Sequence, residues 1–330
     1  MRQPAPGHNW LNAAMVAAML AGHALALALL MLAVETASGL PMPLGGLLIV
    51  AALAPFGLVL NGYYALAHES FHRALFTSPA ANDLVGVLVS VPLGFSYTLV
   101  RRGHLWHHRV NRGRDARYPL ERPVRRRAAF AAARRLGWWF LVYGGGFYLV
   151  SAGAALLACL LPRATVRTLS PVTRGLSAAE HRRIRLETAL NLAAGAAVWS
   201  AFGGQALVVT CLLPLLAFAL IWSMLQNAFH YDTTVGRPVR WNARNIPVGG
   251  WLRLPWLNFN HHLTHHCFPN EPWYRLATLD PDCPAERLAR NSRVTGLLQA
   301  IGTQAQGPLY GLVAKETEDL GEVYRAEAGS

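Results

Sequence analysis

The chain has 330 residues, of which 53% are hydrophobic and 14% are charged, and its mean hydropathy is +0.25. This composition is typical of an integral membrane protein and argues against a soluble one. The net charge is +13, and every basic residue except Lys315 is an arginine. Because the arginines lie between apolar segments, they indicate loops held on the cytoplasmic side rather than a nucleic-acid-binding surface. The cysteines lack CxxC spacing and predict neither disulfides nor a sulfur-ligated metal: Cys159, Cys211, Cys267 and Cys283.

Two apolar segments near the N-terminus, residues 13–34 and 44–66, are long enough to cross a bilayer. The link between them, residues 35–43, contains no lysine or arginine, so we expect it to lie outside the cell. His68 then lies just inside, past the end of the second span.

The next apolar stretch, residues 83–100, contains Pro92 and Gly94, which predicts an interfacial or half-inserted helix rather than a full span. Residues 101–135 carry twelve arginines and should stay on the cytoplasmic side. Residues 138–161 are long enough to cross the bilayer, but Gly144–Gly146 interrupt the apolar run. The six arginines in 163–185 indicate that the following segment again lies on the cytoplasmic side. A re-entrant or in-plane hairpin over 138–161 reconciles these signals.

Residues 188–202 and 206–224 predict a tight helical hairpin that turns at Gly203, Gly204 and Gln205, although its first arm is short for a span. The predicted fold is therefore an all-α membrane protein with about four transmembrane helices, additional interfacial or re-entrant helices, and both termini inside. Residues 231–330 are more polar and predict a cytoplasmic cap, with the acidic end at 316–327 as an exposed helix or frayed tail. We expect the membrane region, 1–230, and the cap, 231–330, to form one functional domain.

Nine of the 13 histidines fall in four clusters, which read HESFH, HLWHH, a lone histidine and HLTHH. The i, i+3, i+4 spacing within HxxHH places the imidazoles on one face of a helix. Neutral imidazole is the commonest metal ligand, and nine of them exceed what one ion binds. The clusters therefore predict a site for two metal ions, on the cytoplasmic side: His68, His72, His104, His107, His108, His230, His262, His265 and His266.

Histidines that bind a metal usually donate their second ring N–H to a carboxylate, amide or carbonyl. Five polar residues lie close enough in sequence to serve in this way: Glu69, Asp115, Asn227, Asp232 and Asn258.

The HESFH, HLWHH and HLTHH motifs, in this order and beside apolar spans, resemble the three histidine boxes of the membrane fatty acid desaturase superfamily. The resemblance runs from about residue 61 to residue 276, and NFNHHLTHHCFPNEPWYRL around the third box is similar to bacterial members. It implies that the boxes and the lone His230 bind two iron ions. In some members an asparagine four residues before the lone histidine holds a water at one iron. Here Gln226 occupies that position and Asn227 follows it.

The resemblance also implies an activity. A reduced di-iron centre would activate O2 and remove hydrogen from a lipid acyl chain, which gives a C=C bond, so the expected enzyme is a fatty acid desaturase. A hydroxylase or ketolase of the same superfamily, including one that acts on carotenoids, is the alternative, because box spacing does not separate these outcomes. Electrons would come from an external donor such as a ferredoxin-type protein with its reductase. The expected location is the bacterial inner membrane, with the metal site on the cytoplasmic face.

Two other classes of protein fit the sequence less well. HESFH also matches HExxH, in which two histidines bind zinc and Glu69 would be the general base of an intramembrane protease. That hypothesis leaves both HxxHH motifs without a role. A metal transporter would need ionisable residues within the spans, and only His23 lies deep in one.

Of the remaining histidines, His8 and His181 are interpreted as interfacial, and His23 as a hydrogen-bonded structural residue. His261 is out of phase with the third box, so it is expected either to contact the metal-binding histidines from outside or to be exposed to solvent. Tryptophans near span ends are interpreted as membrane-interface anchors rather than substrate contacts: Trp138, Trp139 and Trp222.

Overall fold

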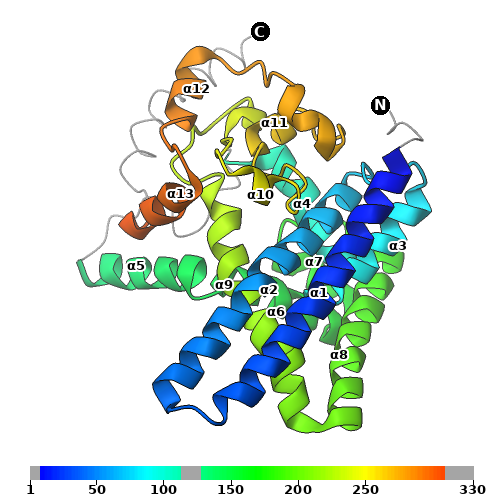
Figure 1. Cartoon of the computed structure of the whole chain (residues 1–330). Coiled ribbons are helices and arrows are strands. Elements are labelled where there is room, and N and C mark those ends of the chain that lie inside the picture. The colour runs from blue at the N-terminus through cyan, green and yellow to red at the C-terminus, as the bar shows by residue number, and fades with distance from the viewer. Residues whose placement is uncertain (1–7, 113–127, 309–330) are drawn as a thin grey trace.

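The computed structural model describes residues 8–112 and 128–308 (Figure 1). Over these ranges every regular element is a helix, and no strand occurs. The predicted all-α class is therefore confirmed. Asp115 and the acidic segment 316–327 lie outside the described residues.

The first two helices, α1 (Asn9–Ala37) and α2 (Met42–Phe71), form an antiparallel pair joined by a short turn (Figure 1). Both helices are long and apolar enough to cross a membrane. They extend beyond the predicted spans, and α2 continues through His68. Nearly all the buried residues of α2 lie between Phe56 and Phe71, whereas Leu44, Leu47 and Val50 are exposed. The half of α2 nearer the cap therefore packs inside the protein, and the other half presents an apolar surface suited to lipid.

Residues 83–100 do not form the single helix that was predicted. Helix α3 (Pro79–Ser90) ends before Pro92, and α4 (Tyr97–Val110) begins after Gly94, which has a positive φ of 63°. Ser96 caps α4 through its side chain, which accepts from the Leu99 N–H. This break turns the chain so that the second histidine box lies on its own helix.

Helices α5 (Ala128–Tyr143) and α6 (Gly146–Leu160) meet at a bend of 80°. Gly145, with φ of 76°, provides the left-handed residue at this bend. In Figure 1, α5 lies across the direction of the long helices. This bent pair agrees with the predicted interruption at Gly144–Gly146. The short helix α7 (Arg163–Leu169) follows.

The predicted helical hairpin is confirmed. Helix α8 (Ala178–Leu207) contains a non-helical Gly203, with φ of 83° and ψ of 175°, where the chain turns. The π-helical segment η3 (Val208–Leu212) and α9 (Leu213–Ala228) then run in the opposite direction (Figure 1). Among the described residues, three helical segments are long and apolar enough to cross a membrane, or four if the bent α5–α6 pair counts as one span. The third of these segments, Ala178–Ala228, includes both arms of the hairpin.

The C-terminal residues cover the ends of α2, α4 and α9 (Figure 1). The cap consists of short helices and turns: η4 (Val239–Trp241), α10 (Gly250–Arg253), α11 (His262–Cys267), η5 (Trp273–Thr278), α12 (Ala285–Asn291), α13 (Leu297–Thr303) and η6 (Gln304–Gln306). Buried hydrogen bonds attach it to the long helices. The Trp273 indole donates to Asn12 Oδ1 (2.9 Å), and Asn227 Nδ2 donates to Gln304 Oε1 (2.7 Å). The predicted boundary at residue 230 stays a prediction.

Candidate metal centre

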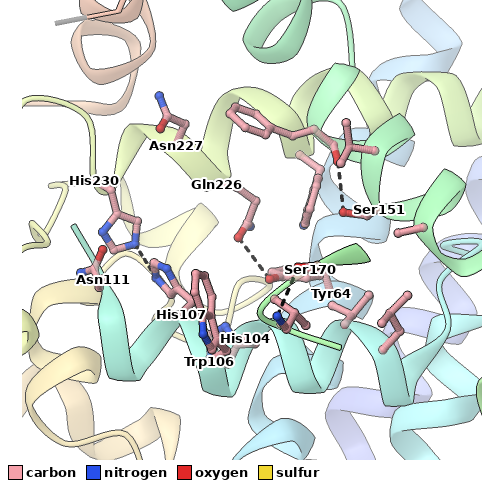
Figure 2. A pocket seen from close by; sticks show the side chains of 18 of the residues that line it. Tyr64, His104, Trp106, His107, Asn111, Ser151, Ser170, Gln226, Asn227 and His230 are labelled. Carbon is pink, nitrogen blue, oxygen red and sulfur yellow. Dashed lines mark hydrogen bonds between the residues drawn. The ribbon is translucent and has the colours of Figure 1, made fainter. Parts of the chain in front are cut away.

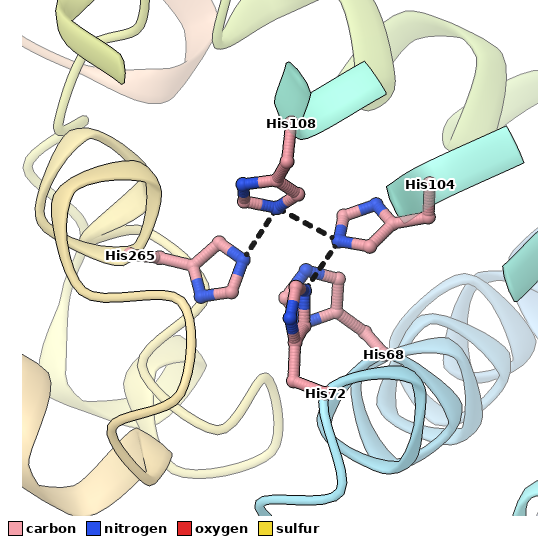
Figure 3. A group of neighbouring side chains, drawn as sticks. All are labelled: His68, His72, His104, His108 and His265. Atoms are coloured by element: carbon pink, nitrogen blue, oxygen red, sulfur yellow. Dashed lines mark hydrogen bonds between the residues drawn. The ribbon is translucent and has the colours of Figure 1, made fainter. Parts of the chain in front are cut away.

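The structure brings all nine clustered histidines together in two neighbouring groups. The first group has five members: His68, His72, His104, His108 and His265 (Figure 3). The second has four members: His107, His230, His262 and His266. Within each group, one ring nitrogen from every member lies within 4.8 Å of the others. Each group therefore has the composition and spacing of a metal site.

Each HxxHH motif contributes to both groups. His104 and His108 of α4 face the first group, and His107 faces the second. The third motif divides in the opposite sense, since His262 and His266 belong to the second group and His265 to the first. Successive residues on a helix differ by about 100° in direction, whereas residues four apart differ by about 40°. An i, i+4 pair can therefore serve one ion while the residue between them turns toward the other.

Short distances between Nε2 atoms connect the rings of the five-membered group. His104 Nε2 lies 2.7 Å from His72 Nε2 and 2.9 Å from His108 Nε2. His108 Nε2 in turn lies 3.0 Å from His265 Nε2. In Figure 3 these nitrogens point toward a common centre between α2, α4 and α11. His68 completes the group, with its ring centroid 4.4 Å from that of His265.

The four-membered group has the same spacing. His230 Nε2 lies 3.1 Å from His107 Nε2 and 3.0 Å from His262 Nε2, and His262 Nε2 lies 3.2 Å from His266 Nε2. His108 and His266, from different groups, stack with ring centroids 4.2 Å apart. The two groups therefore form one continuous layer of imidazoles.

These distances match the requirements of metal ions. Two nitrogens bound at about 2.1 Å and at right angles to each other lie about 3 Å apart. Burial, with a smaller contribution from the neighbouring His68, lowers the pKa of His107 to about 4. Burial likewise holds the pKa values of His262 and His265 well below the usual imidazole value. The rings are therefore neutral near pH 7, which is the form that binds metals, and an all-imidazole site suits iron, zinc or copper.

One hydrogen bond orients an imidazole, and a buried carboxyl group lies near another. His230 Nδ1 donates to the backbone carbonyl of Asn242 at 2.9 Å, which directs Nε2 toward the second group. The Glu69 carboxylate is buried, lies 3.7 Å from His68 Nδ1 and accepts the backbone N–H of Trp273 at 3.1 Å. It thereby links the first box to the segment after the third box. Asn242 is absent from the predicted set because its contact uses a main-chain oxygen that no sequence motif reveals.

The other predicted outer residues bond elsewhere. Gln226 Oε1 accepts the Tyr64 hydroxyl at 3.1 Å, and Asn227 donates to Gln304. Asp232 pairs with Arg290 at 3.5 Å, and the Asn258 amide donates to the Trp273 carbonyl at 3.2 Å. Among the contacts of the described residues, none of these four joins an imidazole of the two groups.

The remaining histidines lie outside both groups. His8 stacks on Tyr274 with centroids 4.1 Å apart, and His23 packs beside Phe56 and Tyr63. His181, interpreted above as interfacial, is instead buried, with Nε2 2.8 Å from the Ala158 carbonyl. His261 precedes α11 and is half-buried.

The interpretation of the tryptophans as interface anchors is wrong for two of the three. Trp138 is fully buried, and its indole donates to the Gln304 carbonyl at 2.9 Å. Trp222 is buried and lines the cavity described next. Trp139 is 40% exposed, which suits an anchor. Trp138 is buried because it packs against the cap. Hydropathy along the chain does not reveal this contact.

A cavity of about 390 Å³ reaches the histidines (Figure 2). One end is lined by His104, His107, His230 and His262. From there the cavity runs between α4, α6 and α9 to Ser151 and Ser170 at the other end. Many of the side chains between these ends are apolar: Leu99, Val100, Phe147, Val150, Ala154, Val172 and Trp222. The cavity therefore suits a hydrocarbon chain, part of which would lie beside the imidazoles.

Long apolar helices that carry two groups of buried imidazoles beside a mainly apolar cavity define a helical membrane protein with a candidate two-metal centre. The fatty acid desaturase family model matches residues 40–294, and the chain belongs to this family of oxidoreductases. The resemblance inferred from the histidine boxes is thus confirmed. None of the proteins with curated functions matches the chain in sequence.

Proposed function

We propose that the nine histidines hold two iron ions and that the protein uses O2 to introduce a C=C bond into a lipid acyl chain. The observation that carries this proposal is the continuity between the histidine groups and the mainly apolar cavity. Iron is favoured among the metals that accept imidazole because family members use it. The bound iron pair would supply the oxidising power, with O2, to remove hydrogen from an unactivated C–H bond.

The residues of the chain supply binding and orientation. Leu99, Phe147 and Trp222 provide apolar walls that hold the acyl chain and exclude water. His104 and His107 line the same cavity, so a methylene held there lies beside both groups. The Tyr64–Gln226 hydrogen bond satisfies two polar groups at the wall of this cavity. Positioning of the chain, rather than acid–base chemistry, is thus the main contribution of the cavity walls.

Removing two hydrogens and reducing O2 to two waters takes two electrons and two protons from outside the chain. We propose a ferredoxin-type donor with its reductase, which would approach the arginine-rich cytoplasmic side. Acidic electron carriers bind such surfaces through complementary charge. In this proposal the protein resides in a bacterial inner membrane, with the metal centre on the cytoplasmic face.

The protease hypothesis gains no support from the surroundings of HESFH. Both histidines of this motif join a group with three further histidines. Glu69, which would be the general base, is buried and accepts the Trp273 N–H. A general base needs to reach a water beside the zinc.

Mass spectrometry of total lipid from a host that expresses the chain with a ferredoxin system tests the proposal. His265→Ala is the inactive variant, and His261→Ala is the matched control, because His261 lies in the same segment but in neither group. We expect products lacking two hydrogens from the wild type and from His261→Ala. Products that gain oxygen would assign a hydroxylase or ketolase instead. Products from His265→Ala at the wild-type level would overturn the metal centre.

A further inference from the structure

The cavity opens on the exposed face of α6. Val150 is 62% exposed and Ala154 is also exposed, yet both line the cavity. The neighbouring exposed side chains of α6 are all large and apolar: Leu149, Leu156, Leu157 and Leu160. Such a surface is compatible with lipid and would be unfavourable in water. The opening therefore lies in a part of the surface suited to contact with the bilayer.

The opposite rim of the opening is the segment between α7 and α8, which contributes Ser170, Val172 and Thr173. Arg102 of α4 holds this segment in place. Its guanidinium donates to the Val172 carbonyl (3.2 and 3.3 Å) and to the Arg174 carbonyl (3.2 Å). It also pairs with Glu180 at 2.6 Å. The rim is thus a fixed edge built on α4, the helix that carries the second histidine box.

In the described part of the chain, no charged side chain lines the outer half of the cavity. Ser151 Oγ donates to the Phe147 carbonyl, and Thr173 Oγ1 donates to the Val166 carbonyl. Ser170 Oγ accepts the Val172 N–H. Among the described lining residues, Arg112 carries a permanent charge. It follows Asn111 in the sequence, and Asn111 lies near His230 (Figure 2).

We propose that the acyl chain enters sideways from the bilayer, between α6 and the 170–173 rim, while its polar head stays in the membrane surface. The substrate is then the chain of a lipid that resides in the bilayer. A chain carried by coenzyme A or an acyl carrier protein would instead have to bring a large, highly charged, water-soluble carrier to the apolar face of α6. This inference rests on the proposed function, because it assumes that the cavity holds the substrate.

Blocking the opening tests the path. Val150→Trp and Ala154→Trp place an indole over the opening, and Leu149→Trp places the same side chain on the exposed face of α6 outside the cavity lining. We expect product formation to fall about tenfold or more in the first two variants and to stay near the wild-type level in Leu149→Trp. Iron per chain should be unchanged in all three, which shows that the centre is intact.

Equal activity in all three variants would overturn the sideways path while leaving the proposed function standing. Loss of product in the wild type as well would instead reject the proposed function.

The carrier is tested with purified protein in vesicles of phosphatidylglycerol and phosphatidylethanolamine that carry palmitoyl and oleoyl chains. A ferredoxin, its reductase and reductant supply the electrons. The comparison adds isotopically labelled palmitoyl-coenzyme A and oleoyl-coenzyme A in solution to the same vesicles. We expect new double bonds in the chains of intact phospholipid and none in the labelled thioesters. New double bonds confined to the labelled thioesters would overturn the inference and would keep the desaturase.

Discussion

His107 and His108 are adjacent in sequence but belong to different histidine groups. The sequence predicts that all nine histidines gather around two ions, and the structure places them together. The division of each HxxHH motif between the groups was not predicted, because the i, i+3, i+4 spacing indicates only a shared face. Which ring turns toward which group depends on how α4, α11 and the end of α9 meet. Those contacts join residues more than a hundred positions apart, such as His107 and His230.

The buried carboxyl group of Glu69 is expected to support iron binding through His68. Glu69→Gln keeps the shape and an oxygen acceptor for the Trp273 N–H but replaces the buried carboxyl group near His68 with an amide. We expect iron affinity to fall roughly ten- to hundredfold, as for other residues that orient metal-binding histidines. Retention of iron against a chelator measures this change. Glu271→Gln, which removes a half-buried pair with Arg275 outside the two histidine groups, is the control. Equal iron retention in the two variants would contradict a positioning role for Glu69.

At the scale of elements, Glu187 of α8 holds the start of α4. Its carboxylate accepts the Ser96 hydroxyl, the Thr98 hydroxyl and the Thr98 N–H at 2.6, 2.6 and 2.9 Å. Glu187→Ala leaves these buried donors unpaired, so we expect a loss of about 1–3 kcal/mol in the free energy of unfolding. Thermal unfolding in detergent is the measurement, with the exposed Glu286→Ala as control. A transition temperature equal to that of the control would contradict this role.

The turn of the α8–α9 hairpin gives a second test at this scale. Gly203 has φ of 83°, and a Cβ there would meet no atom within 4 Å, so only backbone strain opposes a side chain. We expect Gly203→Ala to lower the free energy of unfolding by about 1–2 kcal/mol. Gly204→Ala should have little effect, because Gly204 is equally open and its φ lies outside the left-handed region. Equal unfolding transitions for the two variants would show that the turn tolerates either residue.

Several elements could be predicted because their causes are local. Apolar runs indicated α1, α2 and the hairpin arms, and Gly203–Gln205 indicated the turn. The break of 83–100 into α3 and α4 was missed, although Pro92 and Gly94 mark its position. The burial of Trp138 was missed because it depends on the cap, which begins almost a hundred residues later. Contacts of this kind leave no periodic pattern in the sequence.

If the metal centre faces the cytoplasm, the α1–α2 turn and the cap of the whole molecule lie on opposite sides of the membrane. The exposed Ser38 and Ser292 mark these two regions. In a variant without native cysteines, we expect Ser38→Cys to react with a membrane-impermeant maleimide in intact spheroplasts. Ser292→Cys should react only after lysis. The reverse pattern would contradict the cytoplasmic placement of the metal centre.

Counting the metal ions in the purified protein tests whether the nine histidines hold two iron ions. Elemental mass spectrometry should find about two irons per chain in the wild type and in His261→Ala. Fewer should remain in His265→Ala, which removes a member of the five-histidine group, and in His262→Ala, which removes a member of the four-histidine group. One zinc per chain, unaffected by His265→Ala, would contradict the account.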